Sequence, residues 1–174
     1  MLKKINLNKT KLSKLHYFVI LISLVNLVLY HIPFYRFVLD NTDVKSLNGI
    51  LLVISLTILA IFLNALVFYI GLYLLRVVGK WILVLFFNMN AIAIYFITTY
   101  GVIIDKTMIG NVLNTNYEES SSFFSFALVI YFILLGVIPS ILILKTKIIQ
   151  VKFKKFIIHV SLTLVFLLSL AYAN

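Results

Sequence analysis

The chain has 174 residues, of which 63% are apolar, 15% aromatic and only 11% charged, and its formal net charge is +10. Soluble domains average about half apolar and a quarter charged residues, so a soluble domain of this length could not cover so much apolar surface. The composition excludes an ordinary soluble protein and indicates that the solvent is lipid. The absence of cysteine excludes disulfides and thiolate metal sites.

Five apolar runs are long enough to cross a hydrocarbon core, which takes about 20 helical residues. In chain order they cover residues 17–33, 49–75, 81–104, 123–144 and 156–173. The runs are continuously apolar and do not alternate as barrel strands do. Helices also satisfy their own backbone hydrogen bonds, which lipid cannot do. We therefore predict an all-α membrane protein with five transmembrane helices.

The connections between these runs differ in character. A lysine-rich arm precedes the first run, and no small-x-small cleavage site follows it, so we expect a retained span instead of a signal peptide. Residues 34–48 mix aromatic and charged side chains, which suits an outer interface and a short helix lying on the membrane. The turn at residues 76–80 is so short that the second and third spans should form an antiparallel hairpin. Residues 105–122 are the longest polar stretch.

The basic residues are distributed unevenly between the two sides of the predicted bundle. Twelve of the 15 lie before the first span, between the second and third, or between the fourth and fifth. All five acidic residues lie in the other two connections. The positive-inside rule then places the N-terminus in the cytoplasm and, after five crossings, Asn174 in the periplasm. Because the basic residues flank spans and form no folded face of their own, a nucleic-acid partner is not expected.

No motif in the chain supplies catalytic chemistry by itself. The three histidines, His16, His31 and His159, have no second ligand three or four residues away, so we expect no metal site. Glycine-rich phosphate loops and serine elbows are absent from the sequence. Glu118 and Glu119 are adjacent and point to different helix faces, so they do not form a general acid/base pair.

A polar stripe follows the third span. Asn111, Thr115 and Glu119 are spaced at i, i+4 and i+8, which places them on one face of a short amphipathic helix outside the membrane, between the third and fourth spans. From spacing alone, the stripe is either the solvated face of that helix or a surface that holds a lipid headgroup. Four asparagines lie inside apolar spans, where we expect them to hydrogen-bond to other helices: Asn26, Asn64, Asn88 and Asn90.

Residues 95–120 resemble the N-terminal membrane domain of the lipid A phosphoethanolamine transferases, the family that includes the mobile colistin-resistance enzymes. The resemblance rests on Tyr100-Gly101, Ile104-Asp105, Met108-Ile109 and the Asn111/Thr115/Glu119 spacing. It extends more loosely over the whole chain, in the order and lengths of the apolar runs. It implies a substrate-binding role for Asn111, Thr115 and Glu119, because these positions match ones that contact phosphoethanolamine donor or acceptor in the family.

The resemblance also implies what this chain lacks. In the family, a periplasmic domain with a zinc ion and a threonine nucleophile transfers phosphoethanolamine from phosphatidylethanolamine to lipid A or a related lipopolysaccharide. Residues 1–174 would be the membrane domain without that catalytic domain, so we assign no catalytic residue, metal ligand or cofactor and expect the chain alone to be inactive. By resemblance, it is a multi-pass protein of the bacterial inner membrane that contributes to polymyxin resistance.

Two other interpretations remain open from the sequence. The chain could be a stand-alone membrane protein that binds lipid or associates with a separately encoded catalytic domain. It could instead be a small transporter, although transporters commonly carry ionisable groups at mid-membrane. In this sequence no Asp, Glu, Lys or Arg lies deep within an apolar run.

Overall fold

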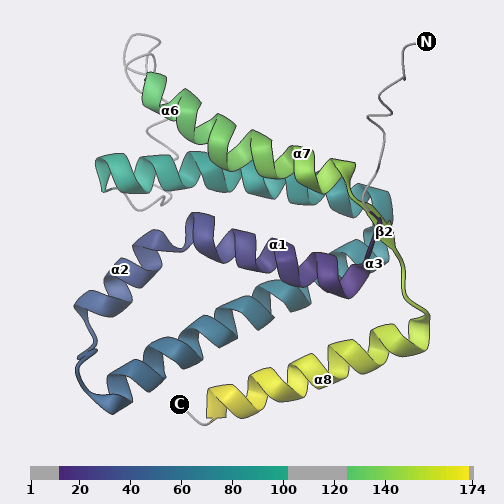
Figure 1. Cartoon of the computed structure of the whole chain (residues 1–174), viewed down its shortest axis with the longest axis horizontal. Helices are drawn as coiled ribbons and strands as arrows, with labels where there is room; N and C mark the ends of the chain where they lie inside the picture. The colour runs from purple at the N-terminus through teal and green to yellow at the C-terminus, as the bar shows by residue number, and fades with distance from the viewer. Residues whose placement is uncertain (1–11, 102–124, 173–174) are drawn as a thin grey trace, which may run out of the picture.

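A computed structural model of the chain describes residues 12–101 and 125–172. The described part is almost entirely helical (Figure 1). In chain order its elements are β1 (Leu12–Lys14), α1 (Leu15–Tyr30), α2 (Ile32–Asp40), α3 (Leu47–Tyr100), α6 (Phe126–Tyr131), η1 (Phe132–Val137), α7 (Ile138–Lys145), β2 (Lys147–Ile149) and α8 (Phe153–Tyr172).

Helix α3 contains a sharp bend at Arg76. Its 54 residues would extend about 80 Å if straight, far more than a hydrocarbon core of about 30 Å. Arg76 has φ 48° and ψ −110°, a conformation that costs a non-glycine residue about 1–3 kcal/mol. Beyond it the chain runs back, and near the bend the Phe68 and Phe86 rings lie 5.7 Å apart. The expected reversal is therefore present, but it occupies one residue instead of the predicted turn at 76–80.

The first predicted span is interrupted. α1 ends at Tyr30, and α2 begins at Ile32 with its axis bent by 64° from that of α1. Pro33 explains the break, because its ring nitrogen cannot donate to the carbonyl four residues earlier and its ring would clash with that carbonyl. The first predicted span thus ends at Tyr30, slightly before the expected end at Pro33, and α2 overlaps the connection at 34–48 where a short helix was expected.

Judged by length and composition, fewer of the described helices could span a membrane than the five that the sequence predicts. Three of the described helices could cross a membrane, or four if the bent pair α1–α2 is one span. They are α3, the continuous helix from Phe126 to Lys145 and α8. Because α3 has two arms separated by the bend at Arg76, the five-span arrangement stays a prediction.

A small sheet joins the start of α1 to the segment before α8. Strands β1 and β2 pair in parallel, with Leu12 opposite Lys147 and Lys14 opposite Ile149. The expectation of an all-α chain missed this pairing, because strands of three residues carry no periodic signal. The strands lie outside the apolar runs, so pairing satisfies backbone groups that no helix satisfies.

The helices run back and forth between two ends (Figure 1). We call one the basic end: it contains β1, the bend in α3, β2 and the start of α8. The opposite end contains α2, Tyr100 and the start of α6. The described cations at the basic end are Lys14, Arg76, Lys80, Lys145, Lys147, Lys152, Lys154 and Lys155. The connections that are basic in sequence thus lie at one end.

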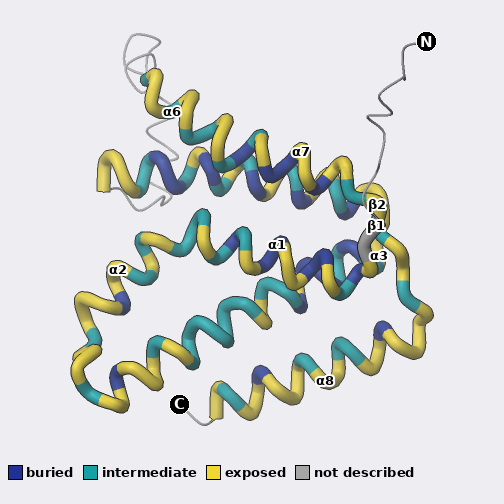
Figure 2. Tube along the Cα trace, viewed as in Figure 1, coloured by how far each residue is buried: buried dark blue, intermediate teal, exposed yellow. Residues whose placement is uncertain are grey.

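The tightest packing lies near the basic end, where α1 rests between the two arms of α3 (Figure 2). The core consists of Leu15, Phe18, Val19, Ile22, Phe68, Tyr69, Leu72, Leu83, Phe87, Ile143 and Phe156. Outward-facing side chains are also apolar: Val28 is 69% exposed, Leu142 62% and Leu168 70%. A surface of this kind is stable in lipid and would aggregate in water.

The fourth helical segment carries one wider π-helical turn, η1, before Pro139. Proline cannot donate a backbone hydrogen bond, so the carbonyl of Leu135, four residues earlier, loses its helical partner. The Tyr30 hydroxyl of α1 donates to this carbonyl instead. Neighbouring helices often satisfy backbone groups that proline frees in membranes. This bond ties α1 to η1.

Candidate functional site

The predicted substrate-binding residues Asn111, Thr115 and Glu119 lie outside the described residues, as does the amphipathic helix expected there. The structure does describe the residues on both sides of this segment. They belong to the far arm of α3 and to α6, at the opposite end (Figure 1). These flanking residues define where the candidate site lies.

The two flanks are joined directly. Gly101 ends α3 in the left-handed conformation, with φ 64°, and its N–H donates to the Ile97 carbonyl at 3.1 Å. Ser125 begins α6 as its N-cap and accepts from the Leu128 N–H at 3.2 Å. The hydroxyls of Ser125 and Tyr95 are 2.6 Å apart. The N-cap of α6 therefore lies beside the last turns of α3.

Aromatic rings cluster where the last turns of α3 meet α6. Tyr95 is only 1% exposed, and its ring lies 5.5 Å from that of Tyr131 and 5.9 Å from that of Tyr100. Phe96 and Tyr100 stack at 5.7 Å. Aromatic rings with a polar tip are typical of the membrane–water interface. The flanks of the candidate site thus have the chemistry of a membrane surface.

Two of the asparagines expected to pack between helices, Asn88 and Asn26, have informative surroundings. Asn88 donates to the Ser140 hydroxyl on α7 at 2.9 Å, which confirms the expectation for that residue. Asn26 is 1% exposed, and its side-chain oxygen has no hydrogen-bond partner in the described part of the chain. Hydrogen bonds between membrane helices contribute about 0.6 kcal/mol on average, so the Asn88 bond specifies packing more than it stabilises it. The expectation of an interhelical bond is not confirmed for Asn26.

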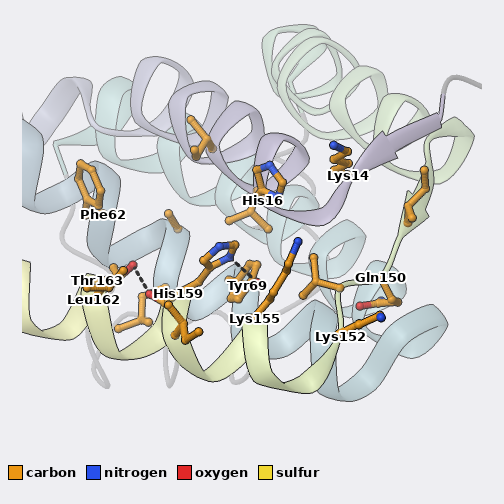
Figure 3. Close-up of a pocket in the computed structure, with 17 residues that line it drawn as sticks. Lys14, His16, Phe62, Tyr69, Gln150, Lys152, Lys155, His159, Leu162 and Thr163 are labelled. Carbon is orange, nitrogen blue, oxygen red and sulfur yellow. Dashed lines mark hydrogen bonds between the residues drawn. The ribbon is translucent and has the colours of Figure 1, made fainter.

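Sequence reasoning missed a pocket of about 730 Å³ at the basic end (Figure 3). It lies between the start of α1, the first arm of α3 and α8, and His16, Tyr69 and His159 approach one another there. The Tyr69 hydroxyl is 3.0 Å from Nδ1 of His159, and the His16 and His159 rings are 5.7 Å apart. Within residues 12–101 and 125–172, no group of three or more His, Cys, Asp or Glu side chains could hold a metal ion.

The sequence contained only part of the signal for this pocket. From the sequence, the lysines that line this pocket were attributed entirely to membrane topology. His16 and His159 are 143 positions apart and become neighbours only because α8 returns to the first arm of α3. The apolar runs alone did not predict that α8 packs there and not against another helix.

Comparison with known sequences places most of the chain in one family. Residues 59–173 match the sequence model of the N-terminal region described as "Phosphoethanolamine transferase EptA/EptB". This range covers part of the first arm of α3, its whole second arm, the segment with Asn111, Thr115 and Glu119, and α8.

Individual relatives agree with the family match. The chain is 33% identical over 126 residues to phosphoethanolamine transferase EptA of Helicobacter pylori, covering 72% of this chain and 23% of the relative. It is 38% identical over 73 residues to phosphatidylethanolamine transferase Mcr-2 of Escherichia coli, covering 42% of this chain and 14% of that relative. The chain thus spans less than a quarter of the length of these relatives.

The fold also has a solved counterpart. The integral membrane protein lipooligosaccharide phosphoethanolamine transferase A (EptA) from Neisseria meningitidis superposes with a TM-score of 0.81 at 20% identity. The match covers 94% of this chain and 31% of that protein. At this identity the likeness establishes the fold, while the sequence match establishes the family. The chain belongs to the phosphoethanolamine transferase family and corresponds to its N-terminal membrane domain.

Proposed function

We propose that the chain is the membrane anchor and lipid-substrate-binding part of a phosphoethanolamine transferase that modifies lipid A or a related lipopolysaccharide acceptor. The donor would be phosphatidylethanolamine. The transfer chemistry, with its zinc ion and threonine nucleophile, would reside in a periplasmic domain beyond residues 1–174. The observation that carries the proposal is the family match over residues 59–173, which includes the predicted polar stripe.

The chemistry of the stripe suits a phosphoethanolamine group. The amide of Asn111 and the hydroxyl of Thr115 can donate to phosphate oxygens. The carboxylate of Glu119 can pair with the ethanolamine ammonium through a charge-assisted hydrogen bond. The described flanks support this role, because the Tyr95 and Ser125 hydroxyls, which are 2.6 Å apart, join the last turns of α3 to the start of α6. The stripe would bind and orient the lipid, and a periplasmic catalytic domain would carry out the transfer.

The charge pattern supports an orientation for this site. We infer that the basic end faces the cytoplasm and the opposite end the periplasm, because the described cations gather around β1, the bend in α3 and β2. Five crossings, with the two arms of α3 counted separately, would then place the polar stripe and the C-terminal end of α8 in the periplasm. A periplasmic catalytic domain following α8 would lie on the same side as the bound lipid.

The test is a pair of substitutions in the complete enzyme, expressed in its own membranes. Glu119→Ala should reduce phosphoethanolamine transfer to lipid A about tenfold or more, because a hydrogen bond to a charged group is worth about 1.5–3 kcal/mol. Glu118→Ala is the matched control: it removes the same charge from the adjacent position, which points to another helix face. Mass spectrometry of extracted lipid A measures the product. Equal activity of the two variants would refute the assignment of Glu119.

A further inference from the structure

We propose that the pocket at the basic end binds the headgroup and upper acyl chain of an anionic diacyl phospholipid from the cytoplasmic leaflet. This goes beyond the proposed function, because the pocket lies at the basic end, whereas the end of α3 and the start of α6, which flank the candidate site, lie at the opposite end (Figure 1). The pocket would therefore not hold the phosphoethanolamine donor.

The pocket opens where the helices meet the predicted membrane surface. His16 is the second residue of α1, and Lys155 lies in the first turn of α8. Leu162 lines the pocket about 10 Å further along α8 than Lys155, at 1.5 Å per residue. The pocket therefore extends from the surface of the bundle toward its interior. A diacyl phospholipid spans the same distance, with its phosphate at the surface and its chains below.

The mouth of the pocket is cationic. Lys14 precedes α1, while Lys152 and Lys155 flank the start of α8, and all three line the pocket from exposed positions. None of the described residues that line it is acidic. Basic pockets between membrane helices on the cytoplasmic side are typical binding sites for anionic lipid headgroups. The charge favours an anionic lipid over a zwitterionic one.

Histidine and tyrosine groups lie just inside this mouth. Nδ1 of His16 is buried and has no hydrogen-bond partner among the residues that the structure describes. Its ring faces His159, whose own Nδ1 is 3.0 Å from the Tyr69 hydroxyl (Figure 3). A buried polar atom without a partner is unfavourable, so a ligand oxygen near His16 would relieve that cost. A headgroup phosphate or hydroxyl would supply such an oxygen.

The deeper wall is apolar and suits an acyl chain. It includes Phe62 and Leu66 of α3 and Leu162 of α8. Aromatic contacts hold α3 and α8 together beside this wall. The Phe156 and Tyr73 ring centroids are 3.8 Å apart, and those of Phe62 and Phe166 are 4.7 Å apart. Free phosphate would use only the cationic mouth, whereas a phospholipid also buries its upper chain at about 0.8 kcal/mol per methylene. Because the cationic mouth continues into the apolar wall, the pocket suits a phospholipid better than free phosphate.

The test compares two double substitutions in the full chain. Lys152→Gln with Lys155→Gln removes two cations that line the pocket. Lys147→Gln with Lys154→Gln removes two cations from the same stretch that do not line it, so both variants change the net charge equally. Each protein is purified in detergent micelles containing phosphatidylglycerol or phosphatidylcholine. Native mass spectrometry counts the retained lipid, and thermal unfolding verifies the fold.

The chain should retain phosphatidylglycerol in preference to phosphatidylcholine. The pocket variant should bind phosphatidylglycerol about 25-fold more weakly, since each of the two lysines near the lipid contributes roughly fivefold. The control variant should bind it like the unmodified chain. Glycerophosphoglycerol, which lacks acyl chains, should not compete. Equal losses in both variants, equal retention of the two lipids, or displacement by glycerophosphoglycerol or inorganic phosphate would overturn the proposal.

Discussion

The two ends of the bundle are held together by different kinds of contact. At the basic end, backbone meets backbone: β1 pairs with β2, and Gly79 lies against Gly71 across the bend of α3. Lys80 also donates to the Thr146 carbonyl. At the opposite end, single side chains connect the helices, as in the Tyr30 bond to Leu135 and the Tyr95 contact with Ser125.

This difference separates a structural role from a functional one. Closely packed backbone permits few alternative arrangements, so the basic end fixes which helices are neighbours. Side-chain bonds at the other end leave the connections free to differ in sequence while their flanks stay in register. The segment with the predicted substrate-binding residues leaves from that second end, which is consistent with function being carried by connections on a rigid scaffold.

The largest effect should come from Gly79 at the bend. A Cβ atom there would lie 2.9 Å from the Gly71 carbonyl oxygen and 3.2 Å from the Leu72 Cα, both of which are backbone atoms. Gly79→Ala should therefore lower the free energy of unfolding by about 2–3 kcal/mol, as overpacking does. Reversible unfolding in detergent micelles measures this change.

Gly71→Ala provides the matched control. Its Cβ would meet nothing within 4 Å, and both substitutions gain the same helix propensity. The difference between the two variants therefore isolates the contact across the bend. If both variants were equally stable, the arms would not be closely packed there, and the contrast between the two ends would fail.

The next largest loss of stability should follow removal of the Tyr30 hydroxyl. Tyr30→Phe would leave the Leu135 carbonyl, already freed by Pro139, without a hydrogen-bond donor in an apolar surrounding. The expected loss is about 1–2 kcal/mol in the free energy of unfolding. Tyr17→Phe on the same helix is the control, because the Tyr17 ring is 62% exposed. An unchanged Tyr30→Phe variant would show that another donor satisfies the carbonyl.

The sequence predicted the helical class and the distribution of charge well, for a physical reason. Long apolar runs and flanking lysines act locally, through transfer into lipid and attraction to one face of the membrane. The family resemblance over residues 95–120 was also confirmed by the match over residues 59–173. These features can be predicted from the sequence because each depends on neighbouring residues in the chain.

The remaining features depend on distant residues or on one special residue. The break after Tyr30 follows from Pro33, near which the first apolar run was expected to end. A reversal at residues 76–80 was predicted, but its confinement to Arg76 has no sequence signal, since arginine rarely adopts a positive φ. The pocket around His16 and His159 required knowledge of where α8 packs. The binding role of Asn111, Thr115 and Glu119 stays a prediction.

The smallest effect should come from the contact that joins the flanks of the candidate site. Tyr95→Phe keeps the ring against Tyr131 and removes only the hydroxyl that lies 2.6 Å from Ser125. It should lower the free energy of unfolding by about 0.5–1.5 kcal/mol. Ser125→Ala should cost more, because it also removes the N-cap of α6, which is worth about 1 kcal/mol.

A double-mutant cycle separates the contact from the cap. If the hydroxyls interact directly, the combined Tyr95→Phe and Ser125→Ala variant should lose about 0.5–1 kcal/mol less than the sum of the single variants. In the complete enzyme, Tyr95→Phe should also lower transfer to lipid A, because the flanks hold the lipid-binding segment in place. Additive losses with unchanged transfer would mean that the flanks meet without coupling. The opposite end would then be held by helix packing and the Tyr30 bond to Leu135 without the Tyr95 contact, and the flanks would not position the candidate site.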